Sequence, residues 1–514
     1  MRDRPPRARP HSWRQLSLLK KAAYVASAAS CAVIMVVALG AYAIYRHLAA
    51  NIHHVNVAGL SHRSIYGVQN ILLLGSQTRR GQGRGFGRNP ALDTSNSDNL
   101  MLVHLDPTHT HAIVLSIPRD TMVYEPGCQA RKTIGNGIWG PYQQAIIDGA
   151  MNIGGPSCAV KTVEDLSDVP LDHFVMFDFN SFRAMVDAMG GVEVCVPRGG
   201  YHDPYSNLNL RGGLHHLTYN QALAYVRTRH GVEAEGDVGG DLPRIMLQQA
   251  FASSVIQKVN HDGILSNIPE LLKIADTATR ALTVDQGLGS VTKLLSLART
   301  LTHLRARDVT MITMPTVTDT AQYGRLLPEE PQDDVLFQML RDGQLWRHGL
   351  PTLRPAQVKV RVLNGTGIPR LAAHTARELR ALGFHVAGTG NTVSPASATT
   401  VTYSGTAQAD SAYTLITRLQ GSPSGQNLLG EPAPQAGHPG TVTLVLGTGF
   451  AGVKPPPARH SATRPGHHAA RRRPRRHTSI GGSGTVVPAI QTRNAGAGLC
   501  TGLPKANPNP GSPP

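Results

Sequence analysis

Residues 112–120, with the sequence Ala-Ile-Val-Leu-Ser-Ile-Pro-Arg-Asp, combine a short apolar run with a charged pair behind a proline. A run of this length bounded by turn residues predicts a buried β-strand, here Ala112–Ile117. Arg119 and Asp120 then lie at the carboxyl end of the strand, where open α/β sheets place their ligands. The segment therefore predicts a sheet and a candidate site together. An Arg–Asp pair at a sheet edge can also be purely structural, and this segment alone leaves both interpretations open.

Strands and helices are predicted to alternate on both sides of this segment. Further strands are expected at 70–75, 99–105, 173–177, 191–196 and 309–314, and helices at 141–152, 158–168, 180–189, 218–227, 241–259 and 286–301. Such alternation predicts an α/β fold, here a layered α-β-α domain with a central mixed sheet over residues 66–345. A small C-terminal α/β domain is expected at 358–449, where Val358–Val362 alternates with period two before an Asn364-Gly365 turn.

The 24 residues from Ala22 to Tyr45 contain no charged side chain. A helix of this length spans a hydrocarbon core of roughly 30 Å. Because basic residues precede it, we predict a cytoplasmic tail at 1–21, a transmembrane anchor at 22–45 and an extracytoplasmic body, in a single-pass protein of the cell membrane. A cleaved signal peptide is the alternative, since small residues are plentiful near 38–43. The apolar core of a signal peptide has only about 7–15 residues, which favours the uncleaved anchor.

The formal net charge of +17 is concentrated in the two ends of the chain. Residues 1–21 and 452–514 carry nearly all of it, and the second of these segments contains no acidic residue. The body between them is close to neutral, which argues against a DNA-binding domain or a nucleic-acid partner. Residues 450–514 are rich in Pro, Gly, Arg and His with few large apolar side chains, and we expect a disordered basic tail there.

Five cysteines are too few for a disulfide-dense miniprotein, and no two of them form a CxxC pair. An extracytoplasmic location permits disulfides. Cys128 and Cys158 are the favoured pair, because both flank predicted loops before one helix. Cys195 lies in a strand-like segment and is expected to be a buried thiol, with Cys31 in the membrane and Cys500 in the tail. Connectivity cannot be fixed from spacing alone.

Several catalytic motifs are absent from the sequence. It contains no GxxxxGK[ST], so the glycine-rich stretch 81–87 is expected to be a surface loop and not a phosphate-binding loop. A GxSxG nucleophile elbow and an HExxH zinc motif are also missing. The His pairs at 53–54, 215–216 and 467–468 have no partner at ligand spacing, which favours solvated surface positions over a zinc site.

A second candidate segment, Tyr225–His230, ends the predicted helix at 218–227. In a continuing helix Arg227 and Arg229 would point about 200° apart. In an extended chain residues i and i+2 point the same way, and two converging guanidinium groups form a phosphate clamp. The alternative is that the cations complement a helix dipole, and on this segment alone that alternative is favoured.

A third candidate segment is the helix that begins at Asp241. Asp241, Arg244 and Gln248 follow one another at i, i+3 and i+7, which places them on one polar stripe of an otherwise apolar helix. A capping Asp with an i,i+3 ion pair is the plain interpretation. A polar stripe that meets an apolar pocket also suits an amphiphile with a phosphate head group.

These segments, in this order and behind a single membrane anchor, resemble the LytR-CpsA-Psr family. The resemblance runs from about residue 70 to residue 249, and the matching segments are 71–76, 97–98, 102–106, 116–120, 154–156, 161–164, 172–173, 186–196, 222–230 and 241–249. Residues 358–449 are similar to the LytR C-terminal domain through Val362-Leu363-Asn364-Gly365-Thr366 and the helix after it.

The resemblance implies an extracytoplasmic phosphotransferase that moves a glycopolymer from a polyprenyl-pyrophosphate lipid to peptidoglycan with the help of Mg²⁺. By position, it implies that Arg119, Arg227 and Arg229 grip the pyrophosphate and that Asp98 holds the metal. It further implies that Asp241, Arg244 and Gln248 line the same site, with Arg79 near the head group. An Asp near the acceptor could take the proton of the sugar hydroxyl, and Asp241 is the candidate. The implied catalytic set is therefore Asp98, Arg119 and Asp241.

The sequence departs from the family pattern at two positions. Gln77 stands where the family usually has an Asp, and Asn96 where it often has an Arg. A neutral amide binds Mg²⁺ less strongly than a carboxylate, so metal affinity is expected to be lower unless Asp93 substitutes. A non-catalytic scaffold that binds wall polymer or lipid, and a pyrophosphatase that uses water as acceptor, remain alternatives. A transcriptional attenuator is disfavoured, because only about 20 residues would face the cytoplasm.

Overall fold

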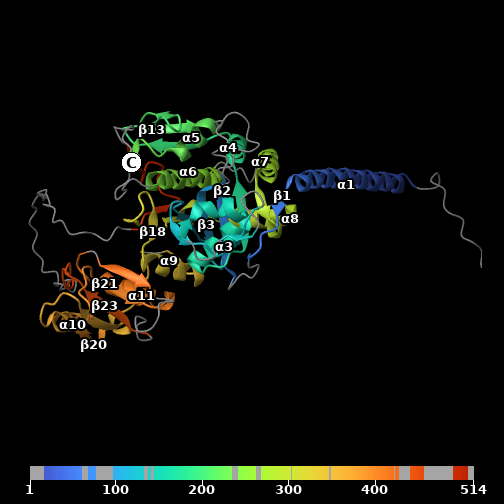
Figure 1. The fold of residues 1–514 in the computed structure, drawn as a ribbon. Helices are drawn as coiled ribbons and strands as arrows, with labels where there is room; N and C mark the ends of the chain where they lie inside the picture. The colour runs from blue at the N-terminus through green and yellow to red at the C-terminus, as the bar shows by residue number, and fades with distance from the viewer. Residues whose placement is uncertain are drawn as a thin grey trace, which may run out of the picture.

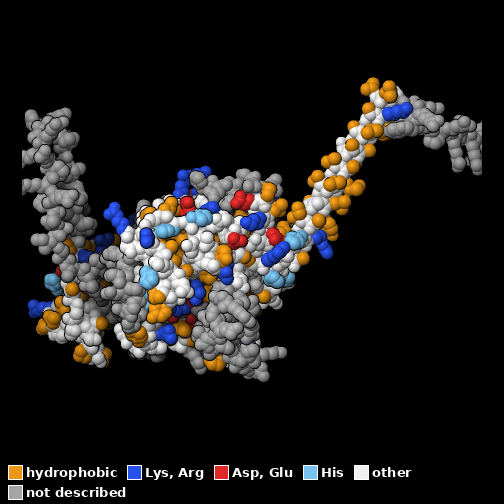
Figure 2. Space-filling view, turned by 90° about the horizontal axis from the view of Figure 1, so that it is seen from above, with side chains coloured by type: hydrophobic (Ala, Val, Ile, Leu, Met, Phe, Trp, Pro, Cys, Tyr) orange, Lys and Arg blue, Asp and Glu red, His pale blue; other side chains and the backbone are white. Residues whose placement is uncertain are grey.

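The computed structural model describes residues 17–60, 67–76, 96–131, 137–139, 144–233, 241–261, 268–302, 304–346, 349–421, 423–427, 440–455 and 490–506. Its first element is the helix α1 (Leu18–Asn51), which contains the predicted anchor. The helix is long and apolar enough to cross a membrane. It projects from the rest of the molecule and carries apolar side chains on its surface (Figures 1 and 2). The exposed apolar surface is consistent with a lipid environment.

Among the described residues, the central sheet has eight strands in the order β1-β15-β9-β2-β3-β4-β16-β24. Their bounds are β1 (His53–Val55), β15 (Thr283–Asp285), β9 (His173–Phe177), β2 (Gln69–Ser76), β3 (Ser97–Leu105), β4 (Ala112–Ile117), β16 (Val309–Thr313) and β24 (Thr492–Asn494). Strand β3 is antiparallel to both β2 and β4, whereas β2 with β9 and β4 with β16 are parallel. The sheet is therefore mixed.

Helices cover both faces of this sheet because side chains alternate along each strand. Leu72 and Leu74 of β2 pack in one cluster with Val160 and Val163 of α3 (Pro156–Ser167). On the other face Met101 and neighbouring strand residues pack against α6 (Leu242–His261), and Ile71 packs in a cluster next to α8 (Val291–Thr302). Figure 1 shows α6 and α3 on opposite sides of β2 and β3. The α-β-α layering predicted from the sequence is confirmed.

A further layer lies on the outer side of α6 (Figure 1). Its core unites Leu247 and Phe251 of α6 with Val194 and Tyr225. The elements of this layer are α4 (Phe179–Ala188), β10 (Val192–Val196), β11 (Tyr201–Asp203), β12 (Leu208–Leu210), β13 (Gly213–Leu217), α5 (Tyr219–Arg227) and α7 (Ile268–Ala281). The layer brings the end of α5 over the start of α6, which positions the arginines discussed below.

The C-terminal domain is a five-stranded sheet among the described residues, in the order β20-β19-β23-β21-β22. Its elements are β19 (Lys359–Asn364), α10 (Leu371–Ala381), β20 (His385–Asn391), β21 (Thr400–Tyr403), α11 (Ala409–Ile416), β22 (Ser424–Asn427) and β23 (Val442–Leu446). The domain meets the α-β-α domain at α9 (Gln332–Arg341), where the hydroxyl of Tyr403 donates a hydrogen bond to Asp334 at 2.7 Å. One continuous apolar core runs through this contact.

The largest departure from the sequence prediction is in the segment 490–506, which was expected to be disordered. There, β24 pairs with β16, and β25 (Lys505–Ala506) pairs with β14 (Val232–Glu233). Cys500 forms a disulfide with Cys195, so the prediction of a buried free thiol at Cys195 was wrong. The error follows from judging the segment by composition, because its stability comes from pairing with distant strands. Cys128 and Cys158, the pair expected from the sequence, are joined by a disulfide.

The structure also differs from the sequence prediction in one expected helix and in helices that were not predicted, α9 among them. The helix expected at 141–152 starts only at Ala150, because β8 (Gln144–Ile146) pairs with β5 (Met122–Tyr124) and a short 3₁₀ turn, η5 (Ile147–Gly149), follows. The helix α7 was not predicted from the sequence.

Candidate functional site

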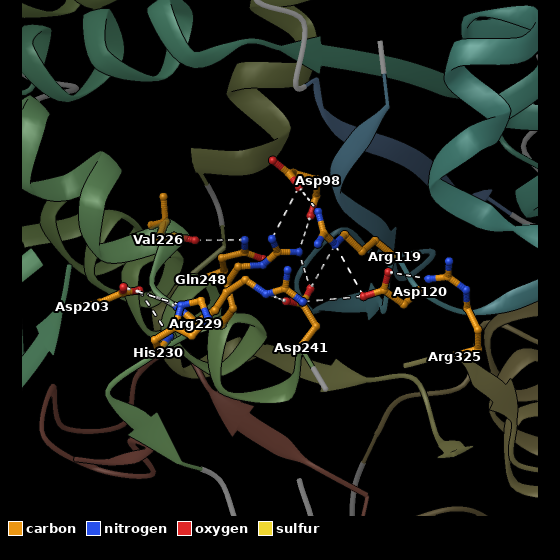
Figure 3. A network of polar contacts seen from close by, with 11 residues as sticks. Asp98, Arg119, Asp120, Asp203, Val226, Arg229, His230, Asp241, Gln248 and Arg325 are labelled. Atoms are coloured by element: carbon orange, nitrogen blue, oxygen red, sulfur yellow. Dashed lines mark hydrogen bonds and ion pairs between the residues drawn. The ribbon is translucent and has the colours of Figure 1, made fainter. Parts of the chain in front are cut away.

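The candidate site lies where one end of the central sheet meets the start of α6 (Figure 3). Strand β3 runs against β4, so Asp98 near the start of β3 lies beside Arg119, which follows the end of β4. Asp241 precedes α6 and accepts the backbone N–H of Ile245 through its carbonyl oxygen at 3.1 Å, and Arg244 lies in the first turn. The first and third candidate segments of the sequence are thus adjacent.

Charged side chains from these elements form one network. Arg119 donates a hydrogen bond to Oδ1 of Asp98, and its Nε lies 3.8 Å from Oδ2 of Asp241. Arg244 donates to both Asp98 and Asp241 and bonds the backbone carbonyl of Asp98 at 3.1 Å. In Figure 3 the side chains of Asp98, Arg119 and Asp241 point toward one another. The strand end and the helix start are therefore held together by ion pairs.

The second candidate segment enters the same network from α5. The helix ends at Arg227, and Thr228 is extended, with φ −64° and ψ 128°. This is the conformation in which side chains two residues apart turn the same way. Nε of Arg229 lies 3.0 Å from Asp241 Oδ1, while the guanidinium of Arg227 sits 5.0 Å above the ring of Phe179. Both arginines line one cavity, which the helix-dipole interpretation does not require.

The carboxylate of Asp203 on β11 fixes the turn that carries Arg229. Its Oδ2 accepts the backbone N–H groups of Arg229 at 3.0 Å and His230 at 3.2 Å, and its Oδ1 accepts the N–H of Tyr205 at 2.9 Å. Only 1% of its side chain is exposed. The sequence analysis did not select Asp203, because nothing local indicates that β11 would lie against this turn.

Burial and charge act in opposite directions on the arginines. Burial opposes the charge of Arg119, but Asp241, Asp98 and Asp120 outweigh burial and hold the pKa of Arg119 above its usual value. At Arg229 burial prevails over the attraction of Asp241, with Arg119 and Arg244 adding repulsion, and the pKa is lowered. A bound anion would relieve that repulsion, so the cluster is suited to a phosphate group.

The cavity beside the cluster has a volume of about 230 Å³. Its lining residues are Asp98, Arg119, Phe179, Asp203, Tyr205, Ser206, Arg227, Arg229, His230 and Arg244. A larger cavity of about 470 Å³ lies at the opposite end of β2, next to Asn70, but its lining includes Glu164, Asp165 and Asp168. An acidic lining repels a pyrophosphate, so we take the smaller, arginine-lined cavity as the candidate site.

The remaining candidate residues from the sequence are Gln248, Asp120 and Arg79. Gln248 donates its amide N–H to the carbonyl of Val226 at 3.2 Å and so connects α6 to the end of α5. Asp120 lies 3.9 Å from Arg229 and 3.6 Å from Arg325, a residue that the sequence analysis did not select. Arg79, together with positions 77 and 93, lies outside the described residues.

Asp148 is a further acidic residue near the cluster that the sequence analysis missed. Its backbone N–H bonds the carbonyl of Arg119 at 3.3 Å, and its Oδ2 accepts the amide of Asn96 at 3.4 Å. Burial raises the pKa of Asp148 to about 6, although Arg119 acts in the opposite direction. Asp148 lies in the segment 141–152, which was predicted to be a helix with no functional residue.

The acidic residues fit a magnesium ion that is shared with a substrate. Mg²⁺ is usually held by one or two carboxylates together with phosphate oxygens. Asp98 lies in the arginine cluster, and Oδ1 of Asp148 is buried without a hydrogen-bond partner in the described part of the chain. Over the same residues no cluster of three or more His, Cys, Asp or Glu side chains is arranged for a metal. One or two carboxylates of this kind suit a metal that also binds phosphate oxygens.

Comparisons with known proteins match both halves of the chain. The profile of the LytR_cpsA_psr family matches residues 41–337, and that of the LytR cell envelope-related transcriptional attenuator matches residues 357–450. The cell wall biosynthesis protein LcpA of Corynebacterium glutamicum is 29% identical over 359 residues, which are 63% of this chain and 67% of LcpA.

Two further proteins match a smaller part of this chain or match it at lower identity. The polyisoprenyl-teichoic acid–peptidoglycan teichoic acid transferase TagV of Bacillus subtilis is 32% identical over 36% of this chain and 43% of TagV. Among solved structures, the LytR-Csp2A-Psr enzyme from Actinomyces oris covers 56% of this chain and 96% of its own, with 22% identity and a TM-score of 0.44.

Proposed function

Because the chain belongs to the LytR-CpsA-Psr family, we propose that it is a membrane-anchored extracytoplasmic phosphotransferase. The enzyme attaches a glycopolymer from a polyprenyl-pyrophosphate lipid carrier to peptidoglycan. Relatives named as teichoic acid–peptidoglycan transferases and as cell wall biosynthesis proteins support a transferase role. The long apolar helix α1 supports the anchor, with the basic residues before it in the cytoplasm and the body outside.

The observation that carries the proposal is the convergence of arginines on one cavity. Arg119, Arg227, Arg229 and Arg244 come from three separate elements and line the same space. Each guanidinium can bind two phosphate oxygens at once, which a lysine cannot do. A pyrophosphate carries several such oxygens, so it can engage more than one of these groups. Ion pairs with Asp98 and Asp241 fix the orientation of Arg119 and Arg229.

The chemistry requires stabilisation of charge on phosphate. The acceptor hydroxyl attacks the phosphorus that carries the glycan, and the bond to the bridging oxygen breaks. Charge then accumulates on the departing polyprenyl phosphate, and fixed guanidinium groups in a partly buried site stabilise it. Asp98 and Asp148 would hold Mg²⁺, which would neutralise phosphate charge when bound.

The test is a transfer assay with the full chain in detergent micelles. The donor is a synthetic octaprenyl pyrophosphate that carries N-acetylglucosamine, and the acceptor is a soluble peptidoglycan fragment. Sugar phosphate on the acceptor together with released octaprenyl phosphate is the expected result. Release with water as the only acceptor would instead indicate a pyrophosphatase. Donor binding without any release would indicate a scaffold, which the neutral side chain of Gln77 would explain.

A further inference from the structure

His230 lines the arginine cavity, and the proposed function has not yet assigned it a role. It follows Arg229 directly and shares the cavity with Arg119 and Arg244. Its side chain is 28% exposed, so the ring is packed on one side and accessible on another. The ring of Tyr205 stacks against it at 4.3 Å between centroids. The imidazole therefore borders the same cavity as the arginines that are proposed to bind the pyrophosphate.

The buried side of the His230 ring faces a carboxylate. Nδ1 of His230 is buried and lies 3.6 Å from Oδ1 of Asp203, and the dashed lines in Figure 3 mark this pair. The distance exceeds a hydrogen bond, but such pairs are often long in ligand-free enzymes and shorten in the complex. A carboxylate on Nδ1 fixes the orientation of the ring and stabilises its protonated form. Nε2 is then the nitrogen left for a substrate proton.

The backbone around His230 is held from both sides, which limits how far the ring can move. On one side, Oδ2 of Asp203 accepts the N–H of His230. On the other side, Val232 of β14 pairs with Ala506 of β25. Gly231 between them has φ +72°, and a Cβ there would overlap the carbonyl oxygen of His202. The turn therefore requires a glycine and presents His230 at a fixed point.

We propose that His230 is the general base of the transfer reaction and that Asp203 is the residue that positions its ring. The inference rests on the proposed function and adds the group that moves the proton. Asp241, the candidate from the sequence, has its two carboxylate oxygens engaged by Arg229 and Arg244. Only 1% of the Asp241 side chain is exposed, whereas His230 is accessible from the cavity.

The step balances without a further reactant. As the acceptor oxygen forms its bond to phosphorus, its proton moves to Nε2 of His230. The phosphorus–oxygen bond to the lipid phosphate breaks, and its electron pair stays on the departing oxygen. Asp203 stabilises the imidazolium, which then returns the proton to the departing phosphate or to water. The products are a phosphodiester between glycan and peptidoglycan and one polyprenyl monophosphate.

His230→Ala and His230→Gln separate proton transfer from binding. Turnover in the assay above is expected to fall at least 100-fold, the lower end of general acid–base contributions. Binding of octaprenyl pyrophosphate, measured by calorimetry, should change less than about threefold, since the arginines remain. Added imidazole should restore part of the activity of His230→Ala. His202→Gln is the matched control, because that exposed histidine lies on β11 outside the cavity, and it should match the wild type.

Each other outcome contradicts a defined part of the inference. If the wild type is active and His230→Ala is equally active, the role of His230 is overturned and the proposed function stays intact. If His230→Ala loses binding and turnover to the same extent, His230 is a binding group, and its role as the general base is overturned. Asp203→Asn alone should lower turnover more than it lowers octaprenyl pyrophosphate binding, and equal losses of the two would show that Asp203 acts only by holding the turn of Arg229. A wild type that releases no octaprenyl phosphate overturns the proposed function and this role together.

Discussion

Cys195 and Cys500, 305 positions apart in the chain, are joined by a disulfide that ties the last described segment to β10. The same segment adds β24 to the central sheet and β25 to β14. The hydroxyl of the buried Tyr201 also donates to the carbonyl of Pro504 at 2.7 Å. This C-terminal strap, residues 490–506, therefore crosses from the sheet to the layer that carries the arginine turn.

Removing the disulfide should destabilise that layer. For the double variant Cys195→Ala and Cys500→Ala we expect a loss of about 2–4 kcal/mol in unfolding free energy, because a cross-link restricts the unfolded chain. Thermal unfolding of the full chain measures the change. Cys31→Ser is the control, since Cys31 is a free thiol on α1. An unchanged melting temperature in the double variant would show that strand pairing alone holds the strap.

Arg229 should contribute more to lipid binding than to folding. Replacing Arg229 by Ala is expected to weaken octaprenyl pyrophosphate binding by about 1–3 kcal/mol, the range for hydrogen bonds to charged groups. Arg229→Lys should restore only part, because an ammonium group cannot form the bidentate contact. Calorimetric titration measures both variants.

The control for Arg229 is the exposed Arg211, outside the cavity. Its replacement by Ala should leave binding unchanged. If Arg229→Ala unfolds the chain while a folded fraction still binds normally, the residue serves the ion pair with Asp241 and not the ligand. The variant Arg227→Ala should behave like Arg229→Ala, since the two side chains line the same cavity.

The contact between the α-β-α domain and the C-terminal domain should respond to pH. Burial raises the pKa of Glu329 to about 7, and burial also raises that of Asp333. Between the ordinary pKa of a glutamic acid, about 4.3, and pH 7, the folded chain keeps a proton at Glu329 that the unfolded chain has lost. Unfolding free energy therefore falls as pH rises through this range, by up to about 3 kcal/mol for Glu329.

The variant Glu329→Gln tests this sign directly. A glutamine can preserve the short contact with Gln332 but has no proton to lose. At pH 5 the variant and the wild type should unfold at similar denaturant concentrations, and at pH 8 the variant should be the more stable. If the stability difference between the variant and the wild type is the same at pH 5 and pH 8, Glu329 is charged in the folded chain at both pH values.

Local patterns were sufficient for the main elements of the fold. Apolar runs predicted the strands around 112–117, and the alternation of strands with helices predicted the α-β-α layers that the structure contains. The sequence also indicated that Arg227 and Arg229 would point to the same side if the chain between them were extended. Whether Thr228 is extended could not be decided locally, because Asp203 on a distant hairpin holds the next two residues.

The missed features all depend on contacts between distant segments. Asp203 and His230 are separated by α5, and only the folding of β11 against the arginine turn brings them together. The strap has a composition typical of a tail, but the strands that it joins provide backbone partners that no local window contains. Asp148 could not be identified from the sequence, because β8 and a 3₁₀ turn occupy the segment where a helix was predicted. Long-range pairing therefore limits prediction more than local propensity does.

The last prediction concerns Gln77, which lies outside the described residues. If this position contacts the metal, Gln77→Asp should raise the apparent affinity for Mg²⁺, because a carboxylate adds a full charge to the magnesium site proposed at Asp98 and Asp148. Transfer measured against Mg²⁺ concentration, with calorimetry of Mg²⁺ binding beside it, gives the comparison with the wild type. Gln82→Asp is the control, since it adds the same charge close to position 77 in the sequence.

The outcome also depends on Asp98. If both acids contact the ion, Gln77→Asp cannot replace Asp98, and the double variant Gln77→Asp with Asp98→Ala should stay inactive. Asp98 additionally pairs with Arg119 and Arg244, so its loss removes the partner that orients two of the arginines proposed to bind pyrophosphate. Superimposable Mg²⁺ curves for Gln77→Asp and the wild type would show that position 77 does not touch the metal. Activity that also survives a chelator would mean that the arginines stabilise the departing phosphate without a metal.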